Sequence, residues 1–430
     1  MLKSKKSYFI PIIGFALIIL VGSIILYLPI SNKLPNTYET AFFTALSGTT
    51  TTGLTKVSLY DQYTFFGQLV ISIMMEVGAM GFLIFISFFW TIMNKKIKIS
   101  DMIAINDSLS SDNIGMFKEY SIYIFKIMMR IQAMGIILFA IRFIPAYGLL
   151  KGLWFSVFHA ISAFANSGYD LMGKNGFIRF QDDVYMQVVT ILIMFSGSIG
   201  ILTLEDLTSN IKNRFKEVKA STKILLFGTS IVVIVPTILL KVFEPDLSIL
   251  KCLFMIVSSR STGLSIVKVS DFSIKSLLMI IVTMFIGGAP TSTAGGVKIV
   301  SIVIIIATII ATLRGEDETI LFWRKIPQLT VRRAFTIFFL FLIILFIAGT
   351  VPYFNTDYDL IQIGFDIVSA ISNTGYGLIN YTHSSIVTDI TMMILMFIGR
   401  VGPLSMVLAF VRNVNDKKYF KYPEENIILW

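Results

Sequence analysis

Long apolar runs separated by short polar segments form the main pattern of this chain. A helix needs about 20 apolar residues to cross a bilayer. Eight runs are long enough to be spans: 8–30, 64–93, 121–145, 184–204, 223–243, 275–312, 334–353 and 386–412. Within each successive pair lies a shorter apolar stretch, which we predict to be a re-entrant half-helix because it is too short to span. These stretches are 38–53, 152–168, 247–263 and 361–375.

Each short stretch ends in a small hydroxyl residue followed by glycine. The four endings are Leu46-Ser-Gly-Thr-Thr-Thr-Thr-Gly53, Ile161-Ser-Ala-Phe-Ala-Asn-Ser-Gly168, Ile256-Val-Ser-Ser-Arg-Ser-Thr-Gly263 and Val368-Ser-Ala-Ile-Ser-Asn-Thr-Gly375. The pattern predicts an all-α polytopic membrane protein, with four pseudo-fourfold repeats of span, pore half-helix, filter loop and span around a central pore. The predicted repeats are 8–93, 121–204, 223–312 and 334–412, followed by a cytoplasmic tail, 413–430.

A second small-residue motif follows each loop and supports the repeat. The four copies are Gly78-Ala-Met-Gly81, Gly197-Ser-Ile-Gly200, Gly287-Gly-Ala-Pro290 and Gly399-Arg-Val-Gly402. Glycines at such positions let membrane helices pack closely or bend.

The charge distribution orients the chain and excludes nucleic acid as a partner. The net charge is +10, but only 14% of residues are charged, and the mean hydropathy is +0.79. More than half of the 36 Lys and Arg residues lie in alternate connections: 1–7, 94–120, 205–223, 313–333 and 412–430. The positive-inside rule places this side in the cytoplasm. We therefore predict a multi-pass plasma-membrane protein with both termini cytoplasmic and the glycine loops opening to the outside.

The glycine loops have the chemistry of a cation filter. Backbone carbonyls that converge on an axis replace the water around a dehydrated cation. Half-helices that run inward also point their partly negative C-terminal ends at the pore. We predict that the ion is bound by the carbonyls of four segments, called the filter loops from here on: Thr50, Thr51, Thr52 and Gly53; Ala165, Asn166, Ser167 and Gly168; Arg260, Ser261, Thr262 and Gly263; Ser372, Asn373, Thr374 and Gly375. The alternative is four ordinary glycine turns between helices.

A family resemblance makes this hypothesis more specific. The segment Asn373-Thr-Gly-Tyr-Gly377 resembles the Thr-Val-Gly-Tyr-Gly filter of potassium channels. The fourfold unit resembles the Trk/Ktr/HKT superfamily of potassium transporters, and eight spans with short tails are most similar to the Ktr-type membrane subunit. Only the fourth loop has a second glycine two places on, so the resemblance implies one good binding ring rather than several.

That resemblance also implies an assembly. We expect potassium uptake by a homodimer in membrane lipid, regulated by a cytoplasmic ring of subunits with nucleotide-binding domains. ATP, ADP or NAD would then bind only to the partner, and sodium would act as an activator. The chain itself is expected to hold no cofactor apart from the transported potassium.

Two features predict a gate. The segment 287–296, the gate loop, is too rich in small and helix-breaking residues to continue a straight helix, and it resembles the intramembrane loop that plugs the Ktr pore. Its residues are Gly287, Gly288, Ala289, Pro290, Thr291, Ser292, Thr293, Ala294, Gly295 and Gly296. Lys298 follows it, facing the cytoplasmic cavity or snorkelling. Arg400 lies inside the last span, where a charge indicates function. The alternatives are a structural helix kink and an ion pair between Arg400 and Glu76.

Other ionisable residues have smaller predicted roles. Asp366 and His159 occupy matching places in two half-helices, where they would brace the filter from behind or serve only structure. We expect the Arg260 side chain to point away from the ion and His383 to be an exposed loop residue. Two other classes of function stay open: a coupled secondary cation transporter, using sodium or proton symport, and a membrane enzyme. With two His, one Cys and no ligand-spaced group, the sequence argues against an enzyme.

Overall fold

The structure is a computed structural model of the whole chain. It describes residues 6–81, 85, 117–210, 218–290, 292–353, 358–402 and 406. The predicted tail, 413–430, and parts of the first and last predicted repeats lie outside the described residues.

The first span of each predicted repeat is a long apolar helix. These helices are α1 (Lys6–Tyr27), α7 (Phe117–Tyr147), α11 (Ala220–Phe243) and α15 (Gln328–Tyr353). Each contains a segment long and apolar enough to cross a membrane. A helix suits this environment because it satisfies its own backbone hydrogen bonds in lipid. The described residues are thus mostly helical, and the all-α prediction is confirmed.

Shorter helices follow the long ones, where the sequence predicts half-helices. They are α2 (Tyr38–Thr49), α8 (Leu149–Ala165), α12 (Ile249–Ser259) and α16 (Leu360–Ile371). Three have a side-chain cap at the N-terminus: Thr37 and Ser248 accept backbone N–H bonds, and Asp359 forms a capping box with Gln362. These caps satisfy amides that the first turn leaves unpaired.

The second spans are broken where the sequence shows its small-residue motif. They are α4 (Phe65–Met80), α9 (Val184–Ser198) with α10 (Ile201–Asn210), α13 (Ile274–Phe285) with α14 (Ile299–Leu313), and α17 (Ile386–Val401). Gly81, Gly200 and Gly402 interrupt them with φ of 76°, 85° and 93°, which L residues rarely adopt. The axes of α9 and α10 differ by 101°. Among the described second spans, therefore, none continues as one straight helix through its motif.

The first glycine of the same motif has a different role. A Cβ at Gly78, Gly197 or Gly399 would overlap the carbonyl oxygen of Thr49, Phe164 or Ile371, respectively. The ends of these three half-helices therefore rest directly against the second span of the same predicted repeat. In the third repeat Gly287 meets the Gly295 carbonyl of the gate loop instead.

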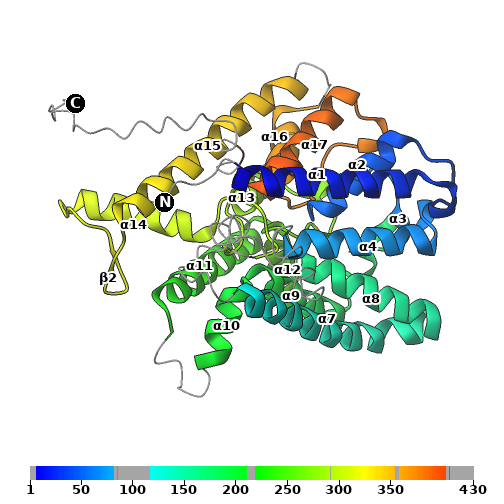
Figure 1. Cartoon of the computed structure of the whole chain (residues 1–430), viewed down its shortest axis with the longest axis horizontal. Coiled ribbons are helices and arrows are strands. Elements are labelled where there is room, and N and C mark those ends of the chain that lie inside the picture. The colour runs from blue at the N-terminus through cyan, green and yellow to red at the C-terminus, as the bar shows by residue number, and fades with distance from the viewer. Residues whose placement is uncertain are drawn as a thin grey trace.

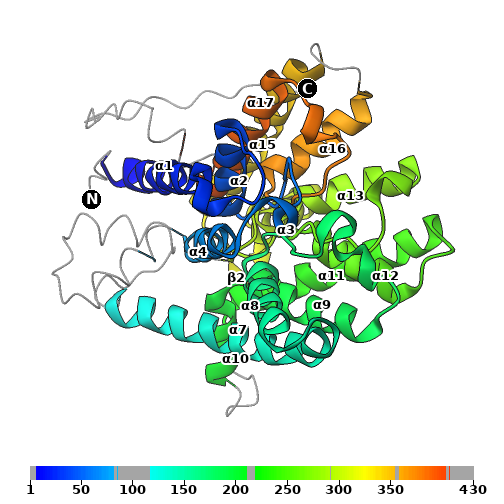
Figure 2. The same cartoon turned by 90° about the vertical axis from the view of Figure 1, so that its right-hand side faces the viewer.

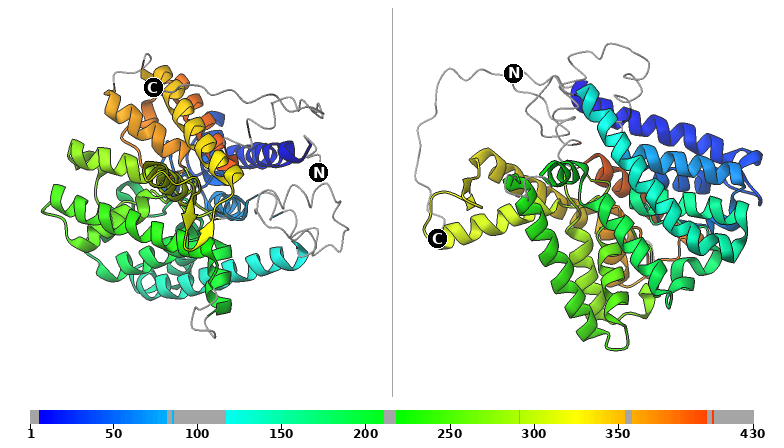
Figure 3. Two further views of the ribbon diagram at one scale, coloured as in Figure 1. Left: turned by 90° about the vertical axis from the view of Figure 1, so that its left-hand side faces the viewer. Right: turned by 90° about the horizontal axis from the view of Figure 1, so that it is seen from below.

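Short elements complete the described fold. They are η1 (Pro29–Ser31), α3 (Leu59–Gln62), η2 (Gly173–Phe180), η3 (Val269–Asp271), η4 (Tyr381–His383), and the strands β1 (Ile320–Leu321) and β2 (Arg324–Lys325). The strands pair as a small antiparallel hairpin that projects from the helical body (Figures 1 and 3).

The helices form four groups around a common centre. Figure 2 shows the groups of α1–α4, α7–α10, α11–α14 and α15–α17 following one another round that centre. The half-helices and their loops lie inside, and buried residues come from all four groups. The outward faces of the long helices carry exposed Leu, Ile, Val and Phe, as expected for a lipid-facing surface.

Candidate functional site

The filter loops begin where the half-helices end. Their backbone amides turn back into the preceding helix. Thr52 donates its N–H to the Ser47 carbonyl at 2.9 Å, and Thr374 donates to the Ser369 carbonyl at 2.8 Å. The next amide in each of these loops, that of the glycine, donates to the same serine's hydroxyl at 3.1 and 3.0 Å. The half-helix thus uses the amides of these two loops, whereas their carbonyls accept no backbone hydrogen bond among the described residues.

The serines that receive these amides were not predicted as site residues. Ser47, Ser162 and Ser369 each stand six places before the loop glycine, and Ser258 stands five places before Gly263. Each is fully buried and accepts the amide of the hydroxyl residue before the glycine through its backbone carbonyl. The signal was present in the sequence, because a serine recurs near the same place in all four motifs.

The backbone of the loops alternates between left-handed and ordinary conformations. Two places before the glycine, φ is 53° at Thr51, 53° at Asn166 and 52° at Asn373; Ser261 is nearly extended, at 159°. The loop glycines are also left-handed, with φ of 95°, 71°, 75° and 93° in chain order. Asparagine tolerates this region, whereas a β-branched threonine rarely does.

The four loops close into a ring through their glycines. A Cβ on Gly53 would overlap the carbonyl oxygen of Ser167 in the next loop. The same relation joins Gly168 to Thr262, Gly263 to Thr374, and Gly375 back to Thr52. Each loop thus touches the next in chain order, and the last touches the first. Only glycine lets the backbones approach this closely.

Two asparagines link neighbouring loops across the ring. Asn373 donates from Nδ2 to the Thr52 hydroxyl at 2.9 Å and to the Met396 carbonyl at 2.8 Å. The Asn166 side-chain amide contacts the Thr262 hydroxyl in the equivalent way. These bonds join the fourth loop to the first and the second to the third.

The gate loop lies against the filter loops at Thr293. The Thr293 hydroxyl donates to the Phe164 carbonyl at 3.2 Å and contacts the Asn166 amide at 2.6 Å. The Thr293 carbonyl accepts from the Thr51 hydroxyl at 3.4 Å. Thr293 is buried, so it joins the first two filter loops from inside the protein.

Gly295 makes the matching contacts with the other two filter loops. Its N–H donates to the Ser261 hydroxyl at 3.0 Å, and a Cβ there would overlap the Ser372 carbonyl. The two gate-loop residues therefore touch all four filter loops. A segment in contact with every member of a ring lies close to the ring's axis.

Local bonds give the gate loop a defined shape. Gly287 donates its N–H to the Val297 carbonyl at 3.0 Å, and Val297 donates to the Phe285 carbonyl at 3.1 Å. These bonds hold the two ends of the loop side by side. The Lys298 ammonium donates to the Ala294 carbonyl. Thr291 lies outside the described residues.

Arg400 reaches the gate loop from α17. Its guanidinium donates to the Thr293 carbonyl and to the Gly78 carbonyl of α4. It therefore links the last span, the gate loop and the second span. The alternative partner, Glu76, instead accepts a hydrogen bond from Gln132 at 2.8 Å.

Comparison with known proteins identifies the family. A family model described as a cation transport protein, TrkH, matches residues 4–422. The chain belongs to the TrkH family of cation transport proteins. The predicted resemblance is thereby confirmed, and the chain is a membrane protein of a cation-transporting family.

Relatives of similar length support this assignment to the TrkH family. The Ktr system potassium uptake protein B of Bacillus subtilis (strain 168) is 30% identical over 426 residues, covering 96% of this chain and 95% of the relative. The potassium/sodium uptake protein NtpJ of Enterococcus hirae is 30% identical, covering 97% and 95%. The crystal structure of the potassium transporter TrkH from Vibrio parahaemolyticus has the same fold, with a TM-score of 0.77 at 16% identity over 95% of this chain and 86% of that one.

In this TrkH-family chain, Asp366 and His159 bond to the backbone just past two filter loops. Asp366 accepts the amides of Leu378 and Ile379 at 2.7 and 3.2 Å and the Tyr381 hydroxyl at 2.7 Å. His159, in the matching place, accepts the Leu171 amide through Nε2 at 3.3 Å. Both acceptors hold the backbone three residues past a filter glycine. His383 lies in η4, but its side chain is not among those that the structure describes, so its exposure stays a prediction.

Two tyrosines that follow filter glycines tie each of these loops to a neighbour. The Tyr169 hydroxyl donates to the Leu54 carbonyl at 3.2 Å, and the Tyr376 hydroxyl donates to the Leu264 carbonyl at 3.2 Å. Both rings are buried. Loops two and four thus fix the chain just beyond loops one and three.

Arg260 is the one charged residue in a filter loop. Its side chain is 1% exposed, and its Nε and NH1 atoms have no hydrogen-bond partner among the described residues. That its side chain points away from the ion stays a prediction.

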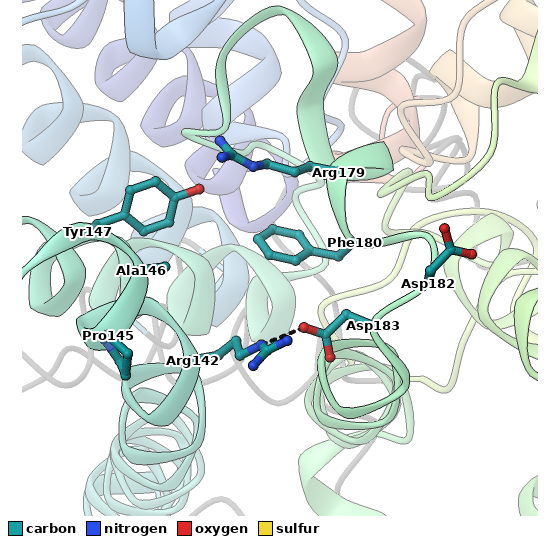
Figure 4. Close-up of a pocket in the computed structure, with 8 residues that line it drawn as sticks. All are labelled: Arg142, Pro145, Ala146, Tyr147, Arg179, Phe180, Asp182 and Asp183. Carbon is teal, nitrogen blue, oxygen red and sulfur yellow. Dashed lines mark hydrogen bonds and ion pairs between the residues drawn. The ribbon is translucent and has the colours of Figure 1, made fainter.

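A pocket of about 530 Å³ lies apart from the filter ring, between the end of α7 and η2. In Figure 4 Arg142 and Asp183 form an ion pair in its wall, at 2.6 Å, and Arg179 lies beside Tyr147. The guanidinium carbon of Arg179 is 5.6 Å from that ring centre. The charges in the wall mostly have partners within it, so we assign no ion site there.

Proposed function

We propose that this protein takes up potassium through a pore whose selectivity ring is formed by the four filter loops. The observation that carries the proposal is the closed ring in which each filter glycine lies against the next loop's carbonyl. Because the amides bond back into the half-helices, a set of carbonyl oxygens is free to replace the water of a cation. The uptake functions named for two relatives, potassium and potassium/sodium, support potassium as the ion.

The gate loop is proposed to close the pore beneath this ring. Its contacts at Thr293 and Gly295 with all four filter loops support an axial position. Arg400 holds the Thr293 carbonyl and places a positive charge close beneath the ring, where it would raise the barrier to a passing cation. Opening would require the gate loop to leave these partners.

The direction of transport follows from the proposed topology. The filter loops open to the outside and both termini lie in the cytoplasm, as the Lys and Arg distribution predicts. A membrane potential then draws each cation inward with about 2.3 kcal/mol per 100 mV. The homodimer, the cytoplasmic regulatory ring with its nucleotide and the sodium dependence are proposed from the family resemblance.

The decisive experiment is rescue of a bacterial strain that lacks its own potassium uptake systems. We expect growth at low potassium when this chain is expressed with a regulatory partner of the Ktr type, and potassium uptake that follows the membrane potential. Sodium-only uptake would contradict the proposed ion. A fixed ratio of potassium to co-transported sodium or protons would instead indicate the coupled secondary transporter.

A further inference from the structure

The starts of α4 and α8 lie at the same end of the molecule, near α3 (Figure 1), and an apolar groove lies between them. Its volume is about 590 Å³, and Phe65, Leu150, Leu153 and Trp154 are among the residues that line it. Leu150 is 84% exposed and Phe65 60% exposed. The groove therefore opens outward, onto the face that a lipid would contact.

Two lysines stand at one edge of this groove. Lys33 precedes the first half-helix, and Lys151 lies in the first turn of α8. Their ammonium nitrogens are 4.4 and 4.8 Å from the centre of the Tyr60 ring. Lys33 also donates to the Tyr60 carbonyl at 2.5 Å, and Lys151 donates to its hydroxyl at 2.7 Å. The Tyr60 ring thus makes cation–π contacts with two ammonium groups.

Neither lysine forms an ion pair with a carboxylate of the described residues. Each ammonium has three donors and uses one of them in the bonds above. Two adjacent like charges repel, so an anion between them would be stabilised. The exposed charge is therefore complementary to an anionic group placed over the apolar groove.

The aromatic residues indicate how deep in the membrane this edge of the groove lies. The Trp154 indole donates to the Gln68 side chain at 2.8 Å, and its ring lies 4.5 Å from that of Phe65. Trp and Tyr gather at the boundary between membrane and water. An apolar groove with Trp, Tyr and two lysines at its edge, placed at that boundary, is complementary to a lipid with a negatively charged headgroup.

We propose that this groove binds an anionic phospholipid of the filter-side leaflet. Its phosphate lies between Lys33 and Lys151, and an acyl chain lies along the groove past Leu153 and Trp154. The site does not depend on which cation the pore carries. It places a lipid beside the first two half-helices, whose C-terminal ends lead into the filter loops.

Native mass spectrometry of the full chain in detergent tests the proposal, with dioleoyl phosphatidylglycerol and dioleoyl phosphatidylcholine as probes. We expect retained phosphatidylglycerol to fall about tenfold or more in the K33Q/K151Q variant, because each lysine near the surface contributes to anionic lipid binding. The matched control K268Q/K275Q removes two exposed lysines, one from the connection before α13 and one from the first turn of that helix, and should bind like the unchanged protein. Equal retention in K33Q/K151Q would overturn the proposal.

A second measurement uses the unchanged lysines. Phosphatidylglycerol with brominated acyl chains should quench tryptophan fluorescence more than brominated phosphatidylcholine does, and Trp154→Phe should remove that difference. Equal quenching by the two lipids would overturn the headgroup assignment. If glycerol phosphate alone displaced phosphatidylglycerol, the groove would be a site for a soluble phosphate. If K33Q/K151Q lost dimer formation in the absence of bound lipid, the groove would hold a second copy of this chain. Either result would overturn the lipid proposal.

Discussion

At the residue scale, the ring of filter loops is stabilised by backbone contacts that cannot be read from a sequence motif. The loop glycines matter because another backbone lies against them, not only because they turn. The hydroxyl residues before them matter through their amides, which bond to serines five places earlier in three of the loops. Both relations follow from tertiary contact. The sequence could indicate which positions are small, but not which carbonyl each one meets.

Substitution of Gly375 tests the ring. In Gly375→Ser the new Cβ meets the Thr52 carbonyl, at a φ of 93° that serine rarely adopts. The fourth loop must therefore shift, and we expect the ratio of potassium to sodium uptake to fall several-fold while the protein is still made. The control is Gly364→Ser in α16, the half-helix before this loop, where a Cβ has no neighbour within 4 Å. An unchanged uptake ratio in Gly375→Ser would contradict the filter assignment.

Arg400 allows a test of the gate. Arg400→Gln removes the guanidinium that holds the Thr293 carbonyl and removes a positive charge from beneath the ring. We expect the maximal potassium uptake rate to rise several-fold. Arg314→Gln, which changes an exposed arginine at the end of α14, should leave the rate unchanged. A lower rate in a folded Arg400→Gln protein would reject the gating role.

At the element scale, the half-helices were the most predictable part of the fold. The stretch predicted at 361–375 contains all but the first residue of α16, Leu360–Ile371, and runs on through the fourth filter loop. Length decides this case, because an apolar segment of about 12 residues cannot span a bilayer. The end of the helix was visible as well, in the asparagine and glycine that follow it.

The breaks in the second spans were only half predictable. A motif such as Gly78-Ala-Met-Gly81 allows either close packing or bending. The structure uses the first glycine for packing against a half-helix end and the second for a turn with positive φ. That division depends on which backbone lies nearby, which local sequence does not encode. The hairpin of β1 and β2 was not predicted, since each strand has only two residues.

A carboxylate that follows α11 and bonds to the start of α13 gives a pH prediction. Glu244 accepts the Ser276 hydroxyl at 2.6 Å and the Ser273 amide at 2.9 Å. Burial alone would raise the pKa of Glu244, but these hydrogen bonds lower it overall from 4.5. Its stabilising effect is therefore complete above pH 4.5 and is lost as the pH falls through the lowered pKa.

Thermal unfolding in detergent checks this effect. Glu244→Gln should lower the Tm by about 1–3 °C at pH 7, because an anion at a helix N-terminus contributes about 0.3–1 kcal/mol. The difference should shrink below pH 4.5. Asp246→Asn, in the same connection, is the control. A difference that grows toward acid would contradict the assignment.

At the scale of the whole molecule, two ion pairs among the described residues cross between predicted repeats. Lys56, just past the first filter loop, contacts Asp389 of α17 at 2.5 Å and Glu39 at 2.6 Å, and the Asp389 side chain is fully buried. Lys251 and Asp182 join the second and third repeats at 2.9 Å, but Asp182 is 79% exposed. Burial should make the first pair far more costly to break.

Removal of each lysine tests that difference. Lys56→Met leaves the Asp389 carboxylate buried without its main partner and should cost about 3–5 kcal/mol. Lys251→Met should cost less than about 1 kcal/mol. Thermal unfolding in detergent measures both, and the double variant Lys56→Met with Asp389→Leu should recover most of the loss. Equal losses for the two lysines would contradict the role of burial.

The Lys56 charge itself should be insensitive to changes of pH below 10.5. Burial alone would lower the pKa of Lys56, but its hydrogen bonds to Asp389 and Glu39 raise the pKa overall from 10.5. The contribution of the Lys56 charge is therefore complete below pH 10.5 and is lost only as the pH rises through the raised pKa.

The contact of Gly375 with Thr52 has a consequence for biosynthesis. The first and last quarters of the chain are neighbours, although more than three hundred residues separate these two in the sequence. A ribosome releases them far apart in time. The first helices must therefore stay in the bilayer without their final neighbour during most of translation. The ring of loops can close only when the last quarter of the chain has been inserted.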